Sequence, residues 1–570
     1  MPAETAAARR MRTLLRALPP PEAEPWLPVI SVEYTAAGDG TLRIGNVSAP
    51  LSHPRRADLV PYGYALAGGE ADETARHLRW LMQKDLNGQD MFLIGPPGPY
   101  KRRLVMLYCE LRRREVEYLC LSRDTTESDL KQRREILPGG STSYTDQAPV
   151  RAAVEGRILI LDGLERAERN VLPTLNNLLE NREMTLEDGR LLLGAERYDE
   201  LLAQYPDADQ GGAELAARGL VRVSPEFRVV ALGLPIPLFP GRPLDPPLRS
   251  RFQARSVPAG EAESLAAELL DGEEGEGEEA TVGGLSTDML RSVVGLAGTL
   301  RLLERQSGGI AAQLPHFADP AVRTLARSIS MFPAAPPAAV LGRCYPHHLV
   351  GKGGAAGEEG DGQSDLVLGA LKRFNLMQGT TSAGPSASGD SSAFACGYIL
   401  AGIEGRDPTQ GRCVLIMAPE GGGGTSTVRV SVPCGALVDS VDVGAVLASL
   451  LPEQQLTLSA MLMDHAVGAD LCVLGGAGSG KTTVARAFGK LLGYAVSTIH
   501  CFADMTSRDL LQRRGTDAVG ATRWESTALI RAAVLGELAI LDGTHRTPPD
   551  VLAILQRLLH DRELELFDGR

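Results

Sequence analysis

Short apolar runs alternate with amphipathic stretches in two parts of the chain. In the first part, residues 73–84 place apolar side chains along one face of a helix, and the runs 91–94 and 227–232 have the length and composition of buried strands. In the second part, 471–474 and 538–542 are two more such runs. Helices alternating with strands of this kind predict an α/β fold, in which helices flank a parallel sheet.

The remaining stretches have a different pattern. Residues 285–304 and 321–331 predict helices, and 41–45, 413–417 and 427–432 predict short strands. Acidic or glycine-rich tracts interrupt the stretch between the two α/β parts, and they cannot bury enough apolar surface to fold alone. We interpret these tracts as linkers or insertions: 273–279, 351–362, 379–392 and 421–424.

The chain contains an internal repeat. Gly95 and Gly475 lie 475 − 95 = 380 positions apart, and the same offset relates further matched segments without a gap. They are 124–134 with 504–514, 151–154 with 531–534, 161–163 with 541–543, and 188–190 with 568–570. This predicts two copies of one α/β module. The sequence stops at Arg570, which matches Arg190, so we expect the second copy to be cut short and the chain to be a fragment of a longer protein.

One segment of the second module specifies a ligand by its spacing. Gly475 and, after four residues, Gly480-Lys481-Thr482 fit G-x-x-x-x-G-K-[ST], the pattern of a phosphate loop. Its glycines let backbone N–H groups surround phosphate oxygens, and the helix that follows directs its positive end at them. We predict that nucleotide contacts come from Gly475, Gly476, Ala477, Gly478, Ser479, Gly480, Lys481, Thr482 and Thr483.

A phosphate loop also needs a metal and an acid. Thr482 would place its hydroxyl on Mg²⁺, and Asp542, at the end of the apolar run 538–542, would hold the same ion directly or through water. An aspartate that caps a turn is the alternative for Asp542. We predict that Lys481 and Asp542 are catalytic and that Thr482 and Asp542 bind the metal.

Neither module has the glutamate that follows this aspartate in many ATPases. Gly163 and Gly543 stand in its place. Glu165 and His545, two residues further on, are candidates to orient the attacking water, and a surface position is the alternative for both. Hydrolysis is therefore a weaker inference than nucleotide binding.

The first module's loop departs from the pattern at two positions. Tyr100 replaces the second glycine and Arg102 replaces the Ser/Thr, while Lys101 keeps the lysine. A ring stands where the backbone must approach phosphate, and a guanidinium cannot bind Mg²⁺. We predict that this loop is structural or binds nucleotide without turnover.

Two arginines follow the last apolar run of the first module. Arg249 and Arg251 lie in a Pro-Pro-Leu-Arg-Ser-Arg-Phe segment. A guanidinium there would suit an arginine finger, which stabilises charge during phosphoryl transfer across a module interface. We predict that Arg251 is catalytic, and an ordinary surface ion pair is the alternative.

Composition narrows the class of protein. The 570 residues are 44% hydrophobic and 23% charged, with a net charge of −13, which argues against nucleic acid as the main partner. The eight cysteines form no C-x-x-C pair, so we expect reduced thiols and neither zinc site nor disulfide framework. No apolar run is long enough to span a membrane. Residues 5–18 hold four arginines and no acid, as in an organellar presequence or a basic tail.

These motifs resemble the MoxR, midasin and dynein branch of the AAA+ ATPases. The resemblance lies in Leu541-Asp542, in 531–536 before that strand, in Arg562-Glu563, and in 248–252 of the first copy. A closer likeness is to mitochondrial AAA+ proteins that carry a von Willebrand A domain further along the chain. It involves the segments 77–84, 93–99, 122–127, 176–183 and 246–255.

The resemblance implies tandem P-loop AAA+ modules that use ATP and Mg²⁺, with a helical lid after the first module. It also implies a hairpin inserted in helix two, at 180–192. Leu234 departs from the polar residue that the family has after its fourth strand. We therefore divide the chain into an N-terminal extension (1–60), a first module (61–255), a lid region with an acidic insertion (256–350), a Gly/Ser-rich linker with a small β element (351–455) and a second module (456–570).

We predict an ATP-binding and ATP-hydrolysing protein that couples nucleotide state to remodelling of a protein partner. A nucleotide-gated scaffold without significant turnover is the alternative, and the repeat disfavours a P-loop kinase. We further expect a ring assembly with other modules or subunits, no nucleic acid, no transmembrane segment, and a mitochondrial rather than a cytoplasmic location.

Overall fold

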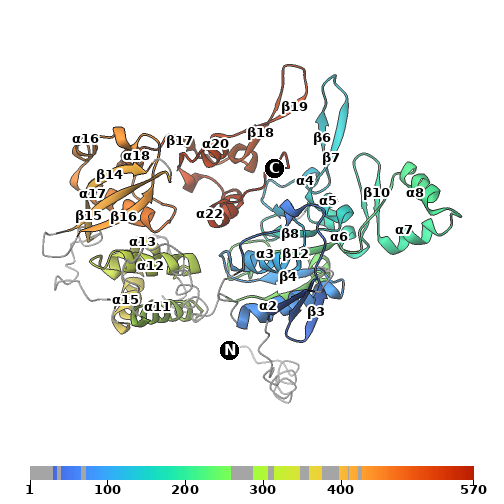
Figure 1. Ribbon diagram of the computed structural model, residues 1–570, viewed down its shortest axis with the longest axis horizontal. Helices are drawn as coiled ribbons and strands as arrows, with labels where there is room; N and C mark the ends of the chain where they lie inside the picture. The colour runs from blue at the N-terminus through green and yellow to red at the C-terminus, as the bar shows by residue number, and fades with distance from the viewer. Residues whose placement is uncertain are drawn as a thin grey trace, which may run out of the picture.

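The computed structural model describes residues 30–34, 40–65, 72–168, 170–258, 287–305, 314–346, 359–374, 376, 397–407, 410–420 and 427–569 (Figure 1). Every structural statement below concerns these residues. Four features singled out in the sequence lie outside them: the basic segment 5–18 and the tracts 273–279, 379–392 and 421–424. The tract 351–362 lies outside them up to residue 358, and its last four residues begin a helix, so the linker prediction is wrong there.

Five parallel strands form the sheet of the first module, in the order β13-β4-β12-β8-β5. They are β4 (Met91–Ile94), β5 (Val116–Cys120), β8 (Ile158–Asp162), β12 (Arg228–Gly233) and β13 (Gln253–Ser256). One face packs against α2 (Asp72–Leu86) and α3 (Tyr100–Arg112), and the other against α5 (Ala148–Glu155) and α6 (Pro173–Glu180). The helix predicted at 73–84 and the strands predicted at 91–94 and 227–232 are confirmed.

A three-stranded antiparallel sheet precedes each phosphate loop. Before the first lie β1 (Ile30–Tyr34), β2 (Gly40–Ile44) and β3 (Val47–Pro50), and before the second lie β14 (Tyr398–Asp407), β15 (Arg412–Pro419) and β16 (Val428–Pro433). The strands predicted at 41–45, 413–417 and 427–432 are confirmed. Because β3 and β16 overlap at the offset of 380, the repeat begins earlier than the sequence matches indicated.

Four helices follow the first module: α11 (Thr287–Arg305), α12 (Asp319–Met331), α13 (Pro337–Cys344) and α15 (Glu359–Arg373). They confirm the helices predicted at 285–304 and 321–331. Their apolar side chains share one core with β14–β16 and with α16 (Val443–Ala448), α17 (Pro452–Ala466) and α18 (Lys481–Leu491). The four helices and the start of the second module therefore pack as one body, at the left of Figure 1.

The second module has only part of the first module's sheet. Strands β17 (Val496–His500) and β20 (Leu538–Asp542) pair in parallel, flanked by α19 (Ser507–Leu510), α20 (Ala528–Leu535), α21 (Pro549–Leu552) and α22 (Gln556–Asp561). The strand predicted at 471–474 is wrong, since these described residues form none. The matching strand β4 is held between β12 and β13, and the described residues of the second module form no strand beside 471–474.

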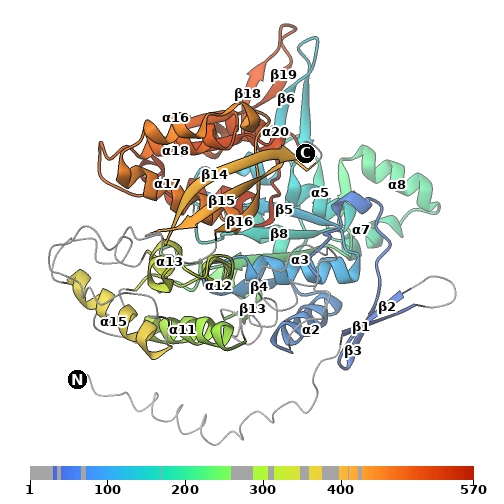
Figure 2. The ribbon, with the colours of Figure 1, turned by 60° about the vertical axis from the view of Figure 1, so that its left-hand side comes forward.

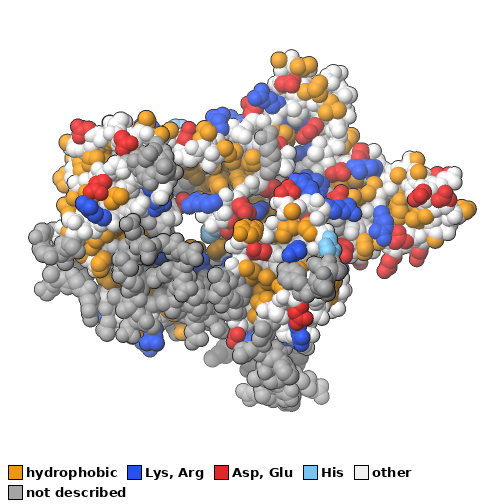
Figure 3. Space-filling view, viewed as in Figure 1, with side chains coloured by type: hydrophobic (Ala, Val, Ile, Leu, Met, Phe, Trp, Pro, Cys, Tyr) orange, Lys and Arg blue, Asp and Glu red, His pale blue; other side chains and the backbone are white. Residues whose placement is uncertain are grey.

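Two hairpins project side by side from the two modules (Figures 1 and 2). They are β6 (Gln132–Ile136) with β7 (Thr142–Asp146), and β18 (Gln512–Thr516) with β19 (Thr522–Ser526). The backbone N–H of Ile136 donates to the Thr522 hydroxyl at 2.9 Å, and Trp524 Nε1 donates to Glu135 at 3.2 Å. Figure 3 shows apolar side chains at their joint tip, where Leu137 and Val519 are exposed.

The assignment of 180–192 as the hairpin inserted in helix two is wrong. A short hairpin does form there, from β9 (Met184–Thr185) and β10 (Leu191–Leu193), but it follows the third strand of the module, β8. The hairpin between the second and third strands is β6–β7, between the short helix α4 (Glu127–Leu130) and α5. The elements that remain in the first module are α7 (Ala195–Leu202), α8 (Ala208–Ala217), β11 (Leu220–Arg222) and α9 (Pro246–Ser250).

Matched leucines in β8 and β20 test how far the two cores differ. Leu161 is fully buried, whereas Leu541 at the same repeat position is half-buried. We expect Leu161→Ala to lower the free energy of unfolding by about 2–5 kcal/mol, as other fully buried leucines do, and Leu541→Ala by clearly less. Denaturant unfolding of both variants measures this, and equal losses would contradict the difference in packing.

Candidate functional site

The phosphate loop of the second module is an open turn that leads into α18. Gly478 and Gly480 have φ angles of 79° and 82°, in the left-handed region that favours glycine. A Cβ on Gly480 would also lie 2.3 Å from Gln454 Nε2, so a side chain has no room there. The loop can therefore expose its backbone N–H groups to a ligand only while these positions are glycine.

Lys481 lies over this loop from the first turn of α18. Its Nζ donates to the carbonyl oxygens of Gly475 at 2.8 Å and Gly476 at 2.6 Å. Residues 475–479 are exposed, and Lys481 is half-buried. The ammonium is thus placed beside the loop, with solvent access to the space in front of it.

Thr482 and Asp542 come together at the base of the same loop. Thr482 Oγ1 lies 3.5 Å from Asp542 Oδ2, although the two residues are 542 − 482 = 60 positions apart. A hydroxyl and a carboxylate oxygen fit Mg²⁺, which keeps several waters and takes few protein ligands beside the phosphates. Within the described ranges no group of three or more His, Cys, Asp or Glu side chains could hold a metal, so these two residues are the structure's candidates.

The candidates for orienting water differ between the modules. His545 is exposed, in a short 3-10 turn (Thr544–Arg546) that follows Gly543. Glu165 is buried, and burial raises the pKa of its carboxyl group. Its Oε2 accepts from the backbone N–H of Leu234 at 3.4 Å, and its Oε1 lies 3.6 Å from Arg166 Nε. Only the first module therefore has an acid at this position, and that acid is engaged within its own module.

The phosphate loop of the first module keeps the lysine but closes the site. Lys101 Nζ donates to the carbonyl oxygens of Gly95, at 2.9 Å, and Pro96, as Lys481 does in the second loop. The hydroxyl of Tyr100 pairs with Thr74 Oγ1 at 3.0 Å, which fixes the ring beside α2. Thr74 and Gln454 occupy matched positions of the repeat. The residue at this position lies beside Tyr100 in the first module and beside Gly480 in the second.

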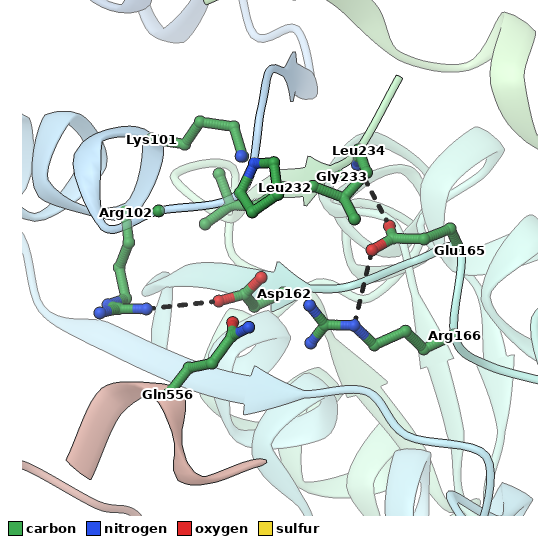
Figure 4. Close-up of a pocket in the computed structure, with 11 residues that line it drawn as sticks. Lys101, Arg102, Asp162, Glu165, Arg166, Leu232, Gly233, Leu234 and Gln556 are labelled. Atoms are coloured by element: carbon green, nitrogen blue, oxygen red, sulfur yellow. Dashed lines mark hydrogen bonds and ion pairs between the residues drawn. The ribbon is translucent and has the colours of Figure 1, made fainter. Parts of the chain in front are cut away.

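Arg102 stands where Thr482 stands in the second module. Its Nη1 lies 3.8 Å from Asp162 (Figure 4), and its Nε donates to Asp561 of the second module at 2.6 Å. Tyr118 donates a further hydrogen bond to Asp162 at 2.6 Å. The cavity at this place measures about 20 Å³, which is room for about one water molecule, and Gln556 of the second module forms part of its wall.

Asp561, Gln556 and Tyr118 are residues that sequence reasoning missed. They belong to no motif, and their only signal is the repeat, in which they match Asn181, Asn176 and Thr498. A comparison of the two copies would have shown that they differ, but not that they meet at the first loop.

Arg251 lies on the first module and pairs there. It forms an ion pair with Glu180 and donates to the carbonyl oxygen of Pro247, while Arg249 is exposed. None of the contacts described for Arg251 reaches the phosphate loop of the second module. Its role as an arginine finger stays a prediction, and any such role would serve a site outside the two loops described here.

Comparisons with known proteins agree with these two loops. The family model "AAA domain (dynein-related subfamily)" matches residues 90–252 and 470–570. The chain carries an AAA domain of the dynein-related subfamily. Each match contains one phosphate loop and its acid-bearing strand, and four of the five strands of the parallel sheet lie within the first match, which ends just before β13. This confirms the α/β fold and the resemblance to the dynein branch.

A relative with this domain matches almost the whole chain. Von Willebrand factor A domain-containing protein 8 from Mus musculus is 43% identical over 577 aligned residues, which cover 99% of this chain and 28% of the relative. A solved structure of a candidate ATPase from Cytophaga hutchinsonii ATCC 33406 covers 53% of this chain and 92% of its own, at 13% identity and a TM-score of 0.25, too low to carry an argument. Among the described residues, no helix is long and apolar enough to cross a membrane.

Gly480 and Gly476 give a matched pair for testing the AAA loop geometry. Gly480→Ala places a Cβ on a residue with a left-handed backbone conformation, close to the side chain of Gln454. A Cβ on Gly476 would have no atom within 4 Å. We expect Gly480→Ala to lower the free energy of unfolding by about 1 kcal/mol or more and Gly476→Ala to change it little. Thermal unfolding of the two variants measures this, and equal effects would contradict the geometry.

Burial of Lys101 predicts a specific pH dependence of stability. Burial lowers the pKa of its ammonium from 10.5 to about 8. Between these values the unfolded chain binds more protons than the folded chain, so the contribution of Lys101 to stability rises with pH. We expect the free energy of unfolding of the wild type to rise, relative to Lys101→Met, between about pH 8 and pH 10. Urea titrations measure the difference, with exposed Lys490→Met as control, and a constant difference would count against the burial.

Proposed function

We propose that the chain binds ATP with Mg²⁺ at the loop 475–482 of the second module and hydrolyses it there, in a protein built from tandem AAA+ modules. The observation that carries this proposal is the convergence of Lys481, Thr482 and Asp542 around an exposed glycine loop. Lys481 would bind the β- and γ-phosphates, and Thr482 and Asp542 would hold Mg²⁺, which neutralises charge on the phosphates during transfer. The chain spans 28% of the length of the relative it matches, so the activity of a whole protein is part of the proposal.

The packing of α18 supports coupling to other parts of the protein. This helix begins at Lys481, and its buried residues Val484, Phe488 and Leu491 lie in the core shared with α11–α15, which we assign as the lid of the first module. A change in the phosphates of a bound nucleotide would therefore act on α18, which packs against the lid. We propose that this coupling remodels a protein partner, within a ring completed by further modules or subunits.

A nucleotide-gated scaffold is the second candidate. Gly543 lies next to Asp542, and the exposed His545 is its nearest replacement for a water-orienting acid. On this alternative, ATP would stabilise the assembly without significant turnover. Binding and hydrolysis must therefore be measured separately.

Binding of ATP tests the site assignment. We expect Lys481→Ala to weaken binding of Mg²⁺-ATP by about 10- to 100-fold, because it removes charge-assisted hydrogen bonds to phosphate. Lys101→Ala is the matched control in the first loop and should leave binding unchanged. Calorimetric titration of both variants measures the affinity, and unchanged binding in Lys481→Ala would overturn the assignment.

Release of phosphate separates the enzyme from the scaffold. For the enzyme, Asp542→Asn should abolish Mg²⁺-dependent release of phosphate while the fold persists, and His545→Ala should slow release by about 10²-fold if the imidazole orients water. Tight ATP binding by the wild type without phosphate release would instead support the scaffold.

We also propose a mitochondrial location, with the cytoplasm as the alternative. Its support is the likeness to mitochondrial AAA+ proteins and the four arginines within residues 5–18, where no acid occurs. Imaging of a fusion that carries residues 1–60 ahead of a fluorescent protein would test it, and diffuse fluorescence would overturn it.

A further inference from the structure

In the first phosphate loop, a positive charge is supplied by a side chain of the protein, that of Arg102. Arg102 is buried, and its guanidinium pairs with Asp162 of its own module (Figure 4) and with Asp561 of the second module. At the matched position of the second loop, Thr482 Oγ1 lies 3.5 Å from Asp542 Oδ2, and neither side chain carries a positive charge. The side chain of Arg102 thus occupies the place that Mg²⁺ would need.

The charges around Arg102 balance without any ligand. Three cations and three anions gather there, around a cavity of about 20 Å³. Arg102 pairs with carboxylates of both modules, and Glu165 lies 3.6 Å from Arg166, so opposite charges of the protein stand side by side. Lys101 is held by backbone carbonyl oxygens, and Arg102 Nη2, Arg166 Nη1 and Glu165 Oε1 are buried without a hydrogen-bond partner. The six groups are Lys101, Arg102, Arg166, Asp162, Glu165 and Asp561.

The helix that carries Asp561 is seated on the first module by further contacts. The Arg557 guanidinium lies 4.6 Å from the centre of the Tyr118 ring, and Cys120 Sγ lies 3.9 Å from the carbonyl oxygen of Ala553. Cys120 packs against the apolar core of the second module. Helix α22 therefore presents Asp561 to Arg102 as part of a continuous interface.

The repeat shows that this pair is particular to the junction between the two modules. Arg102 matches Thr482, and Asp561 matches Asn181, so neither charge occurs at the equivalent position of the other copy. An ion pair inherited from the common module would have appeared in both copies.

We propose that the first phosphate loop is a docking socket for the second module, in which Arg102 replaces the metal and the carboxylate of Asp561 replaces phosphate as its anionic ligand. The socket makes the junction between the modules independent of nucleotide. This inference concerns the first loop alone and does not rest on ATP binding at the second.

Hydrogen exchange of the full chain without nucleotide tests the socket. Asp561→Asn keeps the shape of the side chain and removes its charge, and we expect exchange in peptides covering residues 556–561 and 100–106 to become at least ~10-fold faster. Asp504→Asn, an exposed acid of the same module, is the matched control and should leave these peptides unchanged. Unchanged exchange in Asp561→Asn would overturn the proposal.

Two further measurements distinguish a socket from a loss of fold and from a hidden nucleotide site. Arg102→Met should produce the same effect as Asp561→Asn, and the double variant should exchange no faster than either single variant, while peptides from α11 and α12 stay as in the wild type. In a Lys481→Ala background, Mg²⁺-ATP should bind only with the weakened affinity of the second loop, and adding Lys101→Ala should not change that affinity. Binding that Lys101→Ala then removes would overturn the socket, whereas absence of ATP binding in every variant would overturn only the proposed ATP site.

Discussion

A guanidinium buried between two protein modules needs an opposite charge from each side, and the junction of this molecule depends on that requirement. Arg102 has Asp162 on its own module and Asp561 on the other. An unpaired charge at this depth would destabilise the protein by several kcal/mol. Arg102 has both carboxylates beside it only when the two modules are in contact. The charge balance of the first loop therefore depends on how the modules are arranged.

The two phosphate loops show how few substitutions separate an open site from a closed one. Both lysines fold over their loops and donate to backbone carbonyls in the same way. Glycine at Gly480 leaves the second loop open, whereas the matched Tyr100 packs on Thr74. Where the second loop has the Thr482 hydroxyl near Asp542, the first has the guanidinium of Arg102, which pairs with an acid of the other module.

The elements of the second module contribute to two hydrophobic cores. Helix α18, which follows the open loop, is buried in the core of the four helices after the first module, while β17, β20 and α20 form a separate core that reaches Cys120 of the first module. Leu538 of β20 also packs against the first of these cores, and α18 lies directly against β17 and β20 at Gly489. The loop 475–480 and Asp542 therefore lie where the two cores meet, and a ligand that binds both would contact elements of each.

The sequence by itself determined the parts that depend on local pattern. Periodicity predicted α2, β4, β12 and the helices α11 and α12, and spacing placed Lys481 and Thr482 in one loop, since each of these follows from a short stretch of chain. The structure brought Asp542 to that loop and also showed the earlier start of the repeat.

Only the tertiary structure decided the rest. The strand at 471–474 does not form although its apolar pattern is right, because a strand inside a parallel sheet needs hydrogen-bonding neighbours, and none lies beside it in the described part of the second module. Asp561 meets Arg102 across 561 − 102 = 459 positions of sequence, and no local pattern encodes that distance. A contact between the two modules closes the first loop. Such a contact forms only once both modules have folded.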